Sequence, residues 1–263
     1  MDIKMKDKYT FDELVDIIKV LRGEGGCPWD RVQTHDSLKK SLLEETYETI
    51  EVIDKKDNEK MCEELGDVLL QVVFHGQIAK DEGAFDINDI ITGVCQKMIY
   101  RHTHVFGEDT AETPEDVLVN WEKQKRKEKS IESHTDAVKS VSPALPALMR
   151  SYKVQDKAAK AGFDFPDIYD AFSKVDEELE EFREACGEDG IDHIEEELGD
   201  LLFSIVNVAR FVKVQPELAL GRTIEKFITR FAYIEDEAGK NGRKLDEMSL
   251  EEMDALWNKA KNV

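Results

Sequence analysis

The sequence predicts an all-α protein made of two similar helical domains. Among the 263 residues, Gly (15) and Pro (6) are sparse, whereas residues that favour helices are frequent. Apolar residues recur at helical spacing, and no alternating pattern typical of a strand extends beyond a few residues. One acidic motif occurs twice, first at Glu45 and again at Glu178, an offset of 178 − 45 = 133 residues. We therefore expect a tandem repeat of two helical bundles.

The first half begins with an amphipathic helix over 11–21, with Thr10 placed to cap its N-terminus and Gly23 to end it. A loop is expected over 25–30. Four further helices are expected, and the first two of them carry the acidic motif: 37–54, 58–80, 86–100 and 114–129. Because the connection between the two acidic helices is short, they are predicted to lie antiparallel as a hairpin.

The second half repeats this plan. Five helices are expected, and the second and third carry the acidic motif: 145–161, 167–186, 191–214, 216–240 and a last helix capped by Ser249. The chain is expected to turn at 187–190. The polar stretch 130–142 lacks a clear helical period. We therefore predict an N-terminal domain over 1–129, a linker over 130–142 and a C-terminal domain over 143–263.

Charge and hydropathy exclude several classes of partner. The net charge of −22 disfavours nucleic acid polymers, whose binding surfaces need clustered Lys and Arg. No apolar run approaches the roughly 20 residues of a membrane span. The first eight residues are polar and charged, unlike a signal peptide. We expect a soluble, cytoplasmic protein that does not bind membranes.

Each acidic motif consists of two pairs of carboxylates, and the residues of a pair stand three positions apart. In chain order they are Glu45, Glu48, Glu64 and Asp67 in the first half, and Glu178, Glu181, Glu197 and Asp200 in the second. The gap between the pairs is the same in both halves, because 64 − 48 and 197 − 181 both equal 16. Residues three apart share a helix face, so a hairpin would bring all four carboxylates of a half together.

Four facing carboxylates repel one another unless a cation lies between them. An all-oxygen ligand set suits Mg²⁺, which keeps waters and leaves room for substrate phosphates. In so acidic a chain one such pair arises by chance, and a solvated helix surface is the alternative, but the repeated spacing favours the metal site. Gly66 and Gly199 stand at matching positions within helices, where each costs about 1 kcal/mol relative to Ala. We expect another backbone or a ligand close to them.

Cations and tryptophans also recur after both acidic motifs. The four repeated pairs are Lys97 with Arg101, Lys226 with Arg230, Trp121 with Lys125, and Trp257 with Lys261. Alone, each pair is better explained as a surface charge pair or an anchoring aromatic. In this order they predict contacts to phosphate oxygens and to an aromatic base. The implied ligand is a nucleotide.

These residues make the chain resemble the MazG family of all-α nucleoside triphosphate pyrophosphohydrolases. The matching segments extend over nearly the whole chain: 26–30, 33–34, 44–48, 64–67, 101–106, 145–148, 162–164 and 196–200. The resemblance implies hydrolysis of nucleoside triphosphates, ATP among them, to the monophosphate and pyrophosphate. It also implies dependence on Mg²⁺, broad base tolerance and a homodimer. A role in nucleotide-pool house-cleaning or in the stress response is expected.

By the same resemblance the C-terminal domain is the main catalytic unit. Glu178, Glu181, Glu197 and Asp200 would hold metal there, and the second set of cations and tryptophan would contact the nucleotide. Relatives tend to have Lys four residues before the third acid, where this chain has His193, whereas Lys60 stands at the matching place in the first half. Further candidates for substrate contact are His193, Lys60, Glu177, Glu196 and the cations and tryptophan of the first half. Whether one domain or both are active stays open.

The expected mechanism is attack of water on the α-phosphorus. Either Glu178 or Glu181 would accept the proton of that water, and Lys226 and Arg230 would stabilise charge that develops on the phosphates. An alternative is a regulatory module that binds Mg²⁺–nucleotide, with one or both sites not turning over. A purely structural acidic bundle is a third interpretation.

Overall fold

A computed structural model describes residues 3–187 and 190–261. About 74% of the chain is helical, and the described residues contain no strand, which confirms the predicted all-α fold. The chain divides into two compact units, Met1–Lys125 and Arg126–Val263, called here the N-terminal and C-terminal units. No described helix has the length and apolar character needed to cross a membrane.

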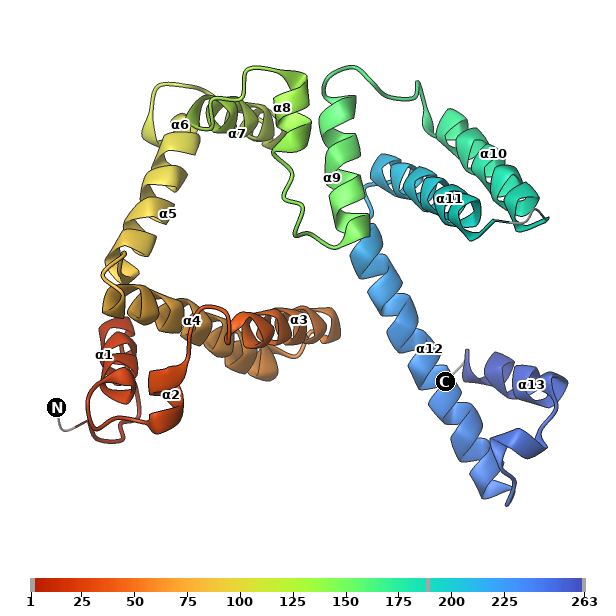
Figure 1. Cartoon of the computed structure of the whole chain (residues 1–263), viewed down its shortest axis with the longest axis horizontal. Helices are drawn as coiled ribbons and strands as arrows, with labels where there is room; N and C mark the ends of the chain where they lie inside the picture. Colours follow the sequence, from red (N-terminus) through yellow and green to blue (C-terminus); the bar gives the residue numbers. More distant parts are fainter. Residues whose placement is uncertain (1–2, 188–189, 262–263) are drawn as a thin grey trace. The chain divides into compact units, whose positions relative to one another are not determined.

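The N-terminal unit contains six helices of the described chain and most of a seventh. They are α1 (Phe11–Arg22), α2 (Pro28–Val32), α3 (Lys39–Lys55), α4 (Asn58–Asp81), α5 (Ile87–Arg101), α6 (Thr103–Phe106) and α7 (Pro114–Glu128). Helices α3 and α4 form the first acidic hairpin, and α1 and α5 pack against α4 (Figure 1). The core of this unit is apolar and consists of Ile18, Leu38, Val73, Phe74, Ile78 and Ile87.

Local signals explain where these helices begin and end. Thr10 and Glu13 form a capping box at the start of α1, and the helix ends at Gly23, as predicted. Lys56 adopts the left-handed conformation (φ 56°) between α3 and α4, and Asp57 then caps α4. The chain therefore reverses over two residues, and the hairpin geometry follows from that short turn.

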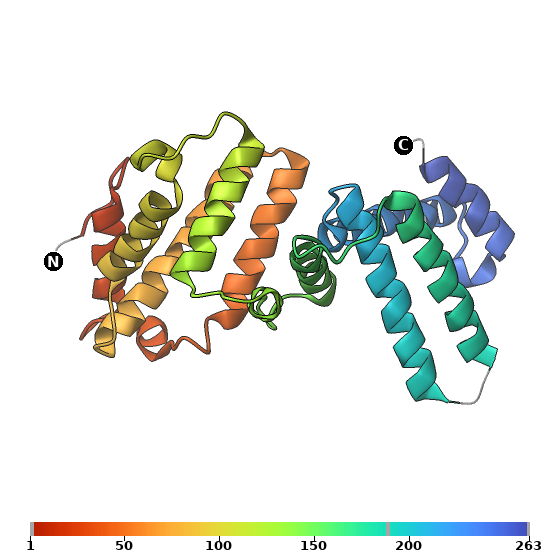
Figure 2. The ribbon, with the colours of Figure 1, turned by 90° about the horizontal axis from the view of Figure 1, so that it is seen from above.

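The C-terminal unit contains the second acidic hairpin. Its helices are α8 (His134–Lys139), α9 (Ala147–Ala159), α10 (Ile168–Gly187), α11 (Ile191–Phe211), α12 (Pro216–Lys240) and α13 (Leu250–Ala260), with a 3₁₀ turn at Leu245–Glu247. Helices α10 and α11 lie side by side in both views (Figures 1 and 2). Helix α9 packs against α11, and α12 packs against α9 and α13.

Three expectations differ from the structure or fall outside it. The short helix α2 occupies part of the loop expected over 25–30, because Pro28 begins a single helical turn. Helix α8 lies within the stretch predicted as a linker. Ser133 and Asp136 form a capping box at its start, but the stretch has no clear helical period, so the helix was not predicted. The turn expected over 187–190 includes residues 188 and 189, which lie outside the described residues. The proposed domain bounds 1–129 and 143–263 stay a prediction.

Candidate metal and nucleotide site

Three carboxylates of the C-terminal unit converge between α10 and α11. Glu178 comes from α10, and Glu197 and Asp200 come from α11; one oxygen of each lies within 4.8 Å of the others. Only 7% of Glu178 is exposed, so this carboxylate faces its neighbours instead of solvent. We call these residues the C-terminal acidic cluster. All of its ligand atoms are carboxylate oxygens, a donor set that fits Mg²⁺.

The N-terminal unit has a related cluster with a different membership. Oxygens of Glu45, Glu48 and Glu64 lie within 4.8 Å of one another, and we call these residues the N-terminal acidic cluster. Asp67, at the position that corresponds to Asp200, is not part of it. Conversely Glu181, which corresponds to Glu48, is not part of the C-terminal acidic cluster. The structure thus brings together three of the four predicted carboxylates in each unit.

Crowding changes the acidity of several carboxyl groups. Burial raises the pKa of Glu45, and the charges of Asp67, Glu48 and Glu64 raise it further. Burial also raises the pKa of Glu64, with the charge of Glu48 as the next cause. The pKa of Glu181 is raised by burial and then by Glu178. A divalent cation at either cluster would offset this repulsion.

Lys174 is a feature of the C-terminal site that the sequence analysis missed. Its Nζ lies 2.7 Å from a carboxylate oxygen of Glu178 and 2.7 Å from one of Glu177, and hydrogen bonds to these two groups raise the pKa of Lys174. The only available signal was its position four residues before Glu178 on one helix face. The corresponding position in the first half, 174 − 133 = 41, is Ser41. The C-terminal acidic cluster therefore has a lysine at this position that the N-terminal acidic cluster lacks.

The remaining polar candidates near the clusters lie on the same helices. His193 Nδ1 lies 3.6 Å from Glu197 Oε1. Glu196 is exposed on α11. Lys60 is exposed on α4, and its charge partly offsets the rise in the pKa of Glu64. His193 and Lys60 thus stand beside matching carboxylates, as their sequence positions indicated.

The C-terminal cations and tryptophan are not part of the acidic cluster of their own chain. Lys226 is exposed on α12, and the Arg230 guanidinium lies 5.4 Å from the ring centroid of Trp257 on α13. Lys261 donates a hydrogen bond to Asn258 Oδ1 at 2.7 Å. These four residues neither join the C-terminal acidic cluster nor line the cavity beside it. Their contact with the nucleotide stays a prediction.

In the N-terminal unit the matching arginine is buried. Arg101 is 6% exposed, and its guanidinium lies 5.0 Å from the ring centroid of Trp121. The His102 ring also packs edge-on against Trp121, with 5.0 Å between ring centroids. Lys97 and Lys125 are half-buried. Arg101 is thus packed into its unit, whereas its counterpart Arg230 is half-buried.

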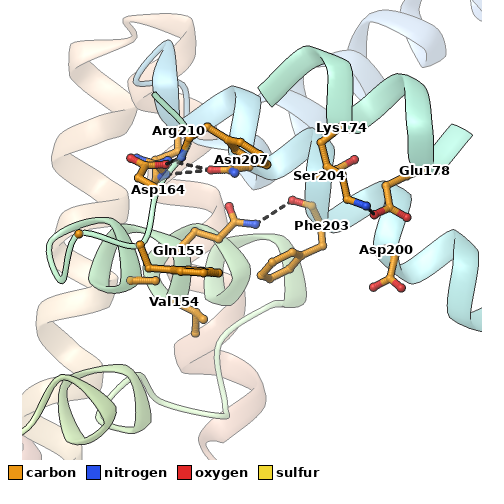
Figure 3. Close-up of a pocket in the computed structure, with 14 residues that line it drawn as sticks. Val154, Gln155, Asp164, Lys174, Glu178, Asp200, Phe203, Ser204, Asn207 and Arg210 are labelled. Atoms are coloured by element: carbon orange, nitrogen blue, oxygen red, sulfur yellow. Dashed lines mark hydrogen bonds and ion pairs between the residues drawn. The ribbon is translucent and has the colours of Figure 1, made fainter. Parts of the chain in front are cut away.

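A cavity of about 500 Å³ lies beside the C-terminal acidic cluster, and we call it the C-terminal cavity. It is formed by α9, α10, α11 and the loop 162–165. Figure 3 shows Glu178 and Asp200 at one end and Arg210, Asp164 and Asn207 at the other. Apart from Glu178, Asp200 and the 162–164 segment, no lining residue was singled out from the sequence, because these residues follow no spacing that marks a site.

The structure leaves open space beside Gly66 and Gly199, the two glycines within the acidic helices. A Cβ built at Gly66 or at Gly199 would meet no atom within 4 Å, leaving aside the helix's own nearby backbone. Within the described residues no other backbone lies close to these glycines, and the alternative expectation of a nearby ligand stays a prediction.

These observations define an all-α protein with an acidic helical hairpin in each of two units. The chain belongs to the MazG family: the MazG nucleotide pyrophosphohydrolase domain matches residues 33–106 and 170–234, one match in each unit. This confirms the family that the sequence motifs indicated.

Similar proteins occur in several bacteria. The chain is 47% identical, over 95% of both chains, to the nucleoside triphosphate pyrophosphohydrolase/pyrophosphatase MazG of Thermotoga maritima. It is 39% identical to the nucleoside triphosphate pyrophosphohydrolase of Escherichia coli K12, over 95% of this chain and 96% of that protein. It is also 50% identical to the uncharacterized protein YabN of Bacillus subtilis, over 97% of this chain but 52% of that protein. The match therefore spans about half the length of YabN.

Proposed function

We propose that this protein hydrolyses nucleoside triphosphates to nucleoside monophosphates and pyrophosphate. The observation that carries the proposal is the convergence of Glu178, Glu197 and Asp200 beside a cavity, within a MazG nucleotide pyrophosphohydrolase domain. Relatives that match almost end to end are named for this activity. A house-cleaning or stress role would follow if the enzyme accepts many bases.

We assign Mg²⁺ to the C-terminal acidic cluster, because its donors are all carboxylate oxygens. When bound, the ion would neutralise charge on the substrate phosphates. Glu181 lies beside Glu178 but outside the cluster, so it is the carboxylate we assign to accept the proton of the attacking water. Lys174, paired with Glu178, supplies a positive charge next to the same site.

A homodimer would complete this site. Lys226, Arg230 and Trp257 do not line the cavity of their own chain, although the family resemblance assigns them to the nucleotide. Helix α11, which carries Glu197 and Asp200, and helix α12, which carries Lys226 and Arg230, both expose large apolar side chains. They are Leu198, Leu202, Ile224, Phe227, Ile228 and Phe231. We propose that these faces pair between two chains. A mass of 30.1 kDa in light scattering at all concentrations would contradict this.

A second function is favoured for the N-terminal unit, which we propose binds Mg²⁺–nucleotide or a metal ion without turnover. Its acidic cluster lacks both a neighbouring lysine at position 41 and the participation of Asp67. Its arginine is buried against Trp121. The N-terminal unit thus retains the carboxylates but has Ser41 in place of the lysine and packs its arginine against Trp121.

Product analysis tests the main proposal. Each common nucleoside triphosphate is incubated with protein and Mg²⁺, and the products are separated. Monophosphate plus pyrophosphate supports the proposal, whereas diphosphate plus phosphate would indicate a different hydrolase. Glu197→Gln should abolish pyrophosphate release while the helix content by circular dichroism stays unchanged. Full turnover in Glu197→Gln combined with Glu64→Gln, which removes a carboxylate of the N-terminal acidic cluster, would contradict the assignment of the site.

A further inference from the structure

We propose that the C-terminal cavity holds the nucleoside part of the substrate, and that Gln155 and Asn207 form the hydrogen bonds to its base. This inference rests on the proposed hydrolysis, because it places the substrate of that reaction. It assigns a ligand site to residues that none of the acidic or cationic motifs includes.

The cavity and the acidic cluster share two residues, Glu178 and Asp200. A triphosphate whose phosphates lie at these carboxylates would therefore extend its nucleoside into the cavity. The apolar residues that line the cavity are Val154, Ala158, Phe163, Phe165 and Phe203. A volume of about 500 Å³ is within the range of sites for small organic ligands. Aromatic walls suit a planar base.

Gln155 presents a hydrogen-bond acceptor with no partner. The side chain is 7% exposed, and its Nε2 donates to the backbone oxygen of Phe203 at 2.8 Å. Because a carbonyl oxygen can only accept, this bond fixes which way the amide faces. The other atom, Gln155 Oε1, is buried and finds no partner among the described residues. A buried acceptor without a partner is unfavourable, and an N–H group of a ligand would satisfy it.

Asn207 presents a hydrogen-bond donor, because the orientation of its amide is also fixed by a neighbouring group. Arg210 donates to Asn207 Oδ1 from Nε at 3.1 Å and from Nη2 at 2.8 Å. Asp164 forms an ion pair with Arg210, so the guanidinium is held in place (Figure 3). The amide oxygen of Asn207 must face this arginine, which leaves its Nδ2 to donate elsewhere. The cavity thus offers one acceptor and one donor, a pair that the polar edge of a nucleobase can match.

The N-terminal unit provides an internal comparison. The positions 133 residues before Gln155 and Asn207 are Arg22 and Phe74. These two side chains pack on each other, with the guanidinium 5.4 Å from the ring centroid, and Phe74 is 5% exposed. The N-terminal unit therefore places a packed arginine and phenylalanine where the C-terminal unit places two amides beside a cavity. This difference favours nucleoside binding by the C-terminal unit.

The test compares nucleotides with inorganic tripolyphosphate, which has the phosphates but no nucleoside. The variants are Gln155→Leu and Asn207→Asp; the second keeps an oxygen for Arg210 and removes only the donor. We expect KM for nucleoside triphosphates to rise about tenfold in each variant, because a hydrogen bond to the ligand is lost. Inhibition by tripolyphosphate should stay within about twofold of wild type. Gln71→Leu is the matched control, since Gln71 is also 7% exposed but lies in the N-terminal unit.

The outcomes separate this inference from the proposed function. Unchanged KM values in both variants, with active wild-type protein, would overturn the cavity assignment and leave hydrolysis standing. A rise in KM with Trp257→Ala alone would place the base at that tryptophan instead. If wild-type protein releases no pyrophosphate, nucleoside binding by the cavity is tested separately. Calorimetry then compares the affinities for Mg²⁺–nucleotide and for tripolyphosphate. Equal affinity for both ligands would then overturn it, and a nucleotide preference that Asn207→Asp removes would support it.

Discussion

The two acidic hairpins share their carboxylate spacing and differ in the residues that pack beside it. In the N-terminal unit, Ser41 stands four residues before Glu45, and the Arg22 guanidinium packs over the Phe74 ring. In the C-terminal unit, Lys174 pairs with Glu178, and Asn207 lines a cavity. The cation site that we propose therefore rests on the carboxylate pairs, which both units have. The residues one or two turns away determine what else can bind, so a repeated motif does not imply a repeated activity.

The largest expected effect concerns packing at the matching positions 74 and 207. Phe74→Ala should lower the free energy of unfolding by about 3–5 kcal/mol, because a ring that is 5% exposed leaves a hole in the N-terminal core. Asn207→Ala should cost about 1 kcal/mol, since this side chain borders space already open. Thermal unfolding of both variants measures the difference. Equal losses would mean that position 207 is as tightly packed as position 74.

The next effect concerns the last acid of each motif. Asp200→Asn should lower kcat by about 10²–10³-fold, because Asp200 belongs to the acidic cluster and borders the cavity. Asp67→Asn should keep kcat within about twofold, because Asp67 lies outside the cluster of its own unit. Pyrophosphate release from a nucleotide panel measures both. A large loss in Asp67→Asn would show that the N-terminal unit also turns over substrate.

The parts that the sequence predicted well are those with local signals. Helix α1 begins after Thr10 and α13 after Ser249 because each forms a capping box with an acid three residues later. The facing carboxylates followed from helical spacing and a short turn. Gln155 and Asn207 could not be found in this way, because their partners, Phe203 and Arg210, depend on how helices and loops pack together. Nor does spacing reveal that Trp257 lies away from the cavity of its own chain.

A smaller effect should have opposite signs in the two clusters. The folded-state pKa of Glu45 is raised, so the protonated carboxyl is favoured in the folded protein. The stability that this provides is lost as pH rises from the ordinary value of 4.5 through the raised pKa. Without Mg²⁺ at pH 7, Glu45→Gln should therefore raise the melting temperature by about 1 °C. Glu178→Gln should lower it by about 2 °C, because it breaks the ion pair with Lys174. Both variants should reduce the stabilisation by added Mg²⁺. A rise in both would mean that the lysine does not offset the repulsion.

The smallest effect concerns the caps of the tryptophan helices, and it depends on pH. Arg243 binds Glu252 through two hydrogen bonds, which lower the pKa of that carboxyl to about 2, and the Ser249 N–H adds to this. The matching cap residue of α7, Asp116, has a pKa lowered by Thr113, with no arginine among the causes. A depressed pKa stabilises the fold above the ordinary value of 4.5, and this contribution is lost as pH falls toward 2. Glu252→Gln should thus lower the melting temperature at pH 6, and the difference from wild type should shrink below pH 4.5.

Asp116→Asn is the matched control for that cap, and it should show a smaller difference over the same pH range. The melting temperatures of wild type and both variants, measured from pH 6 to pH 3, supply the comparison. If the loss in Glu252→Gln does not change with pH, it comes from altered packing of α13 and not from the charge on Glu252. If the two variants lose equally, Arg243 adds nothing to the cap, and the helices that carry Trp121 and Trp257 are held by the capping box alone.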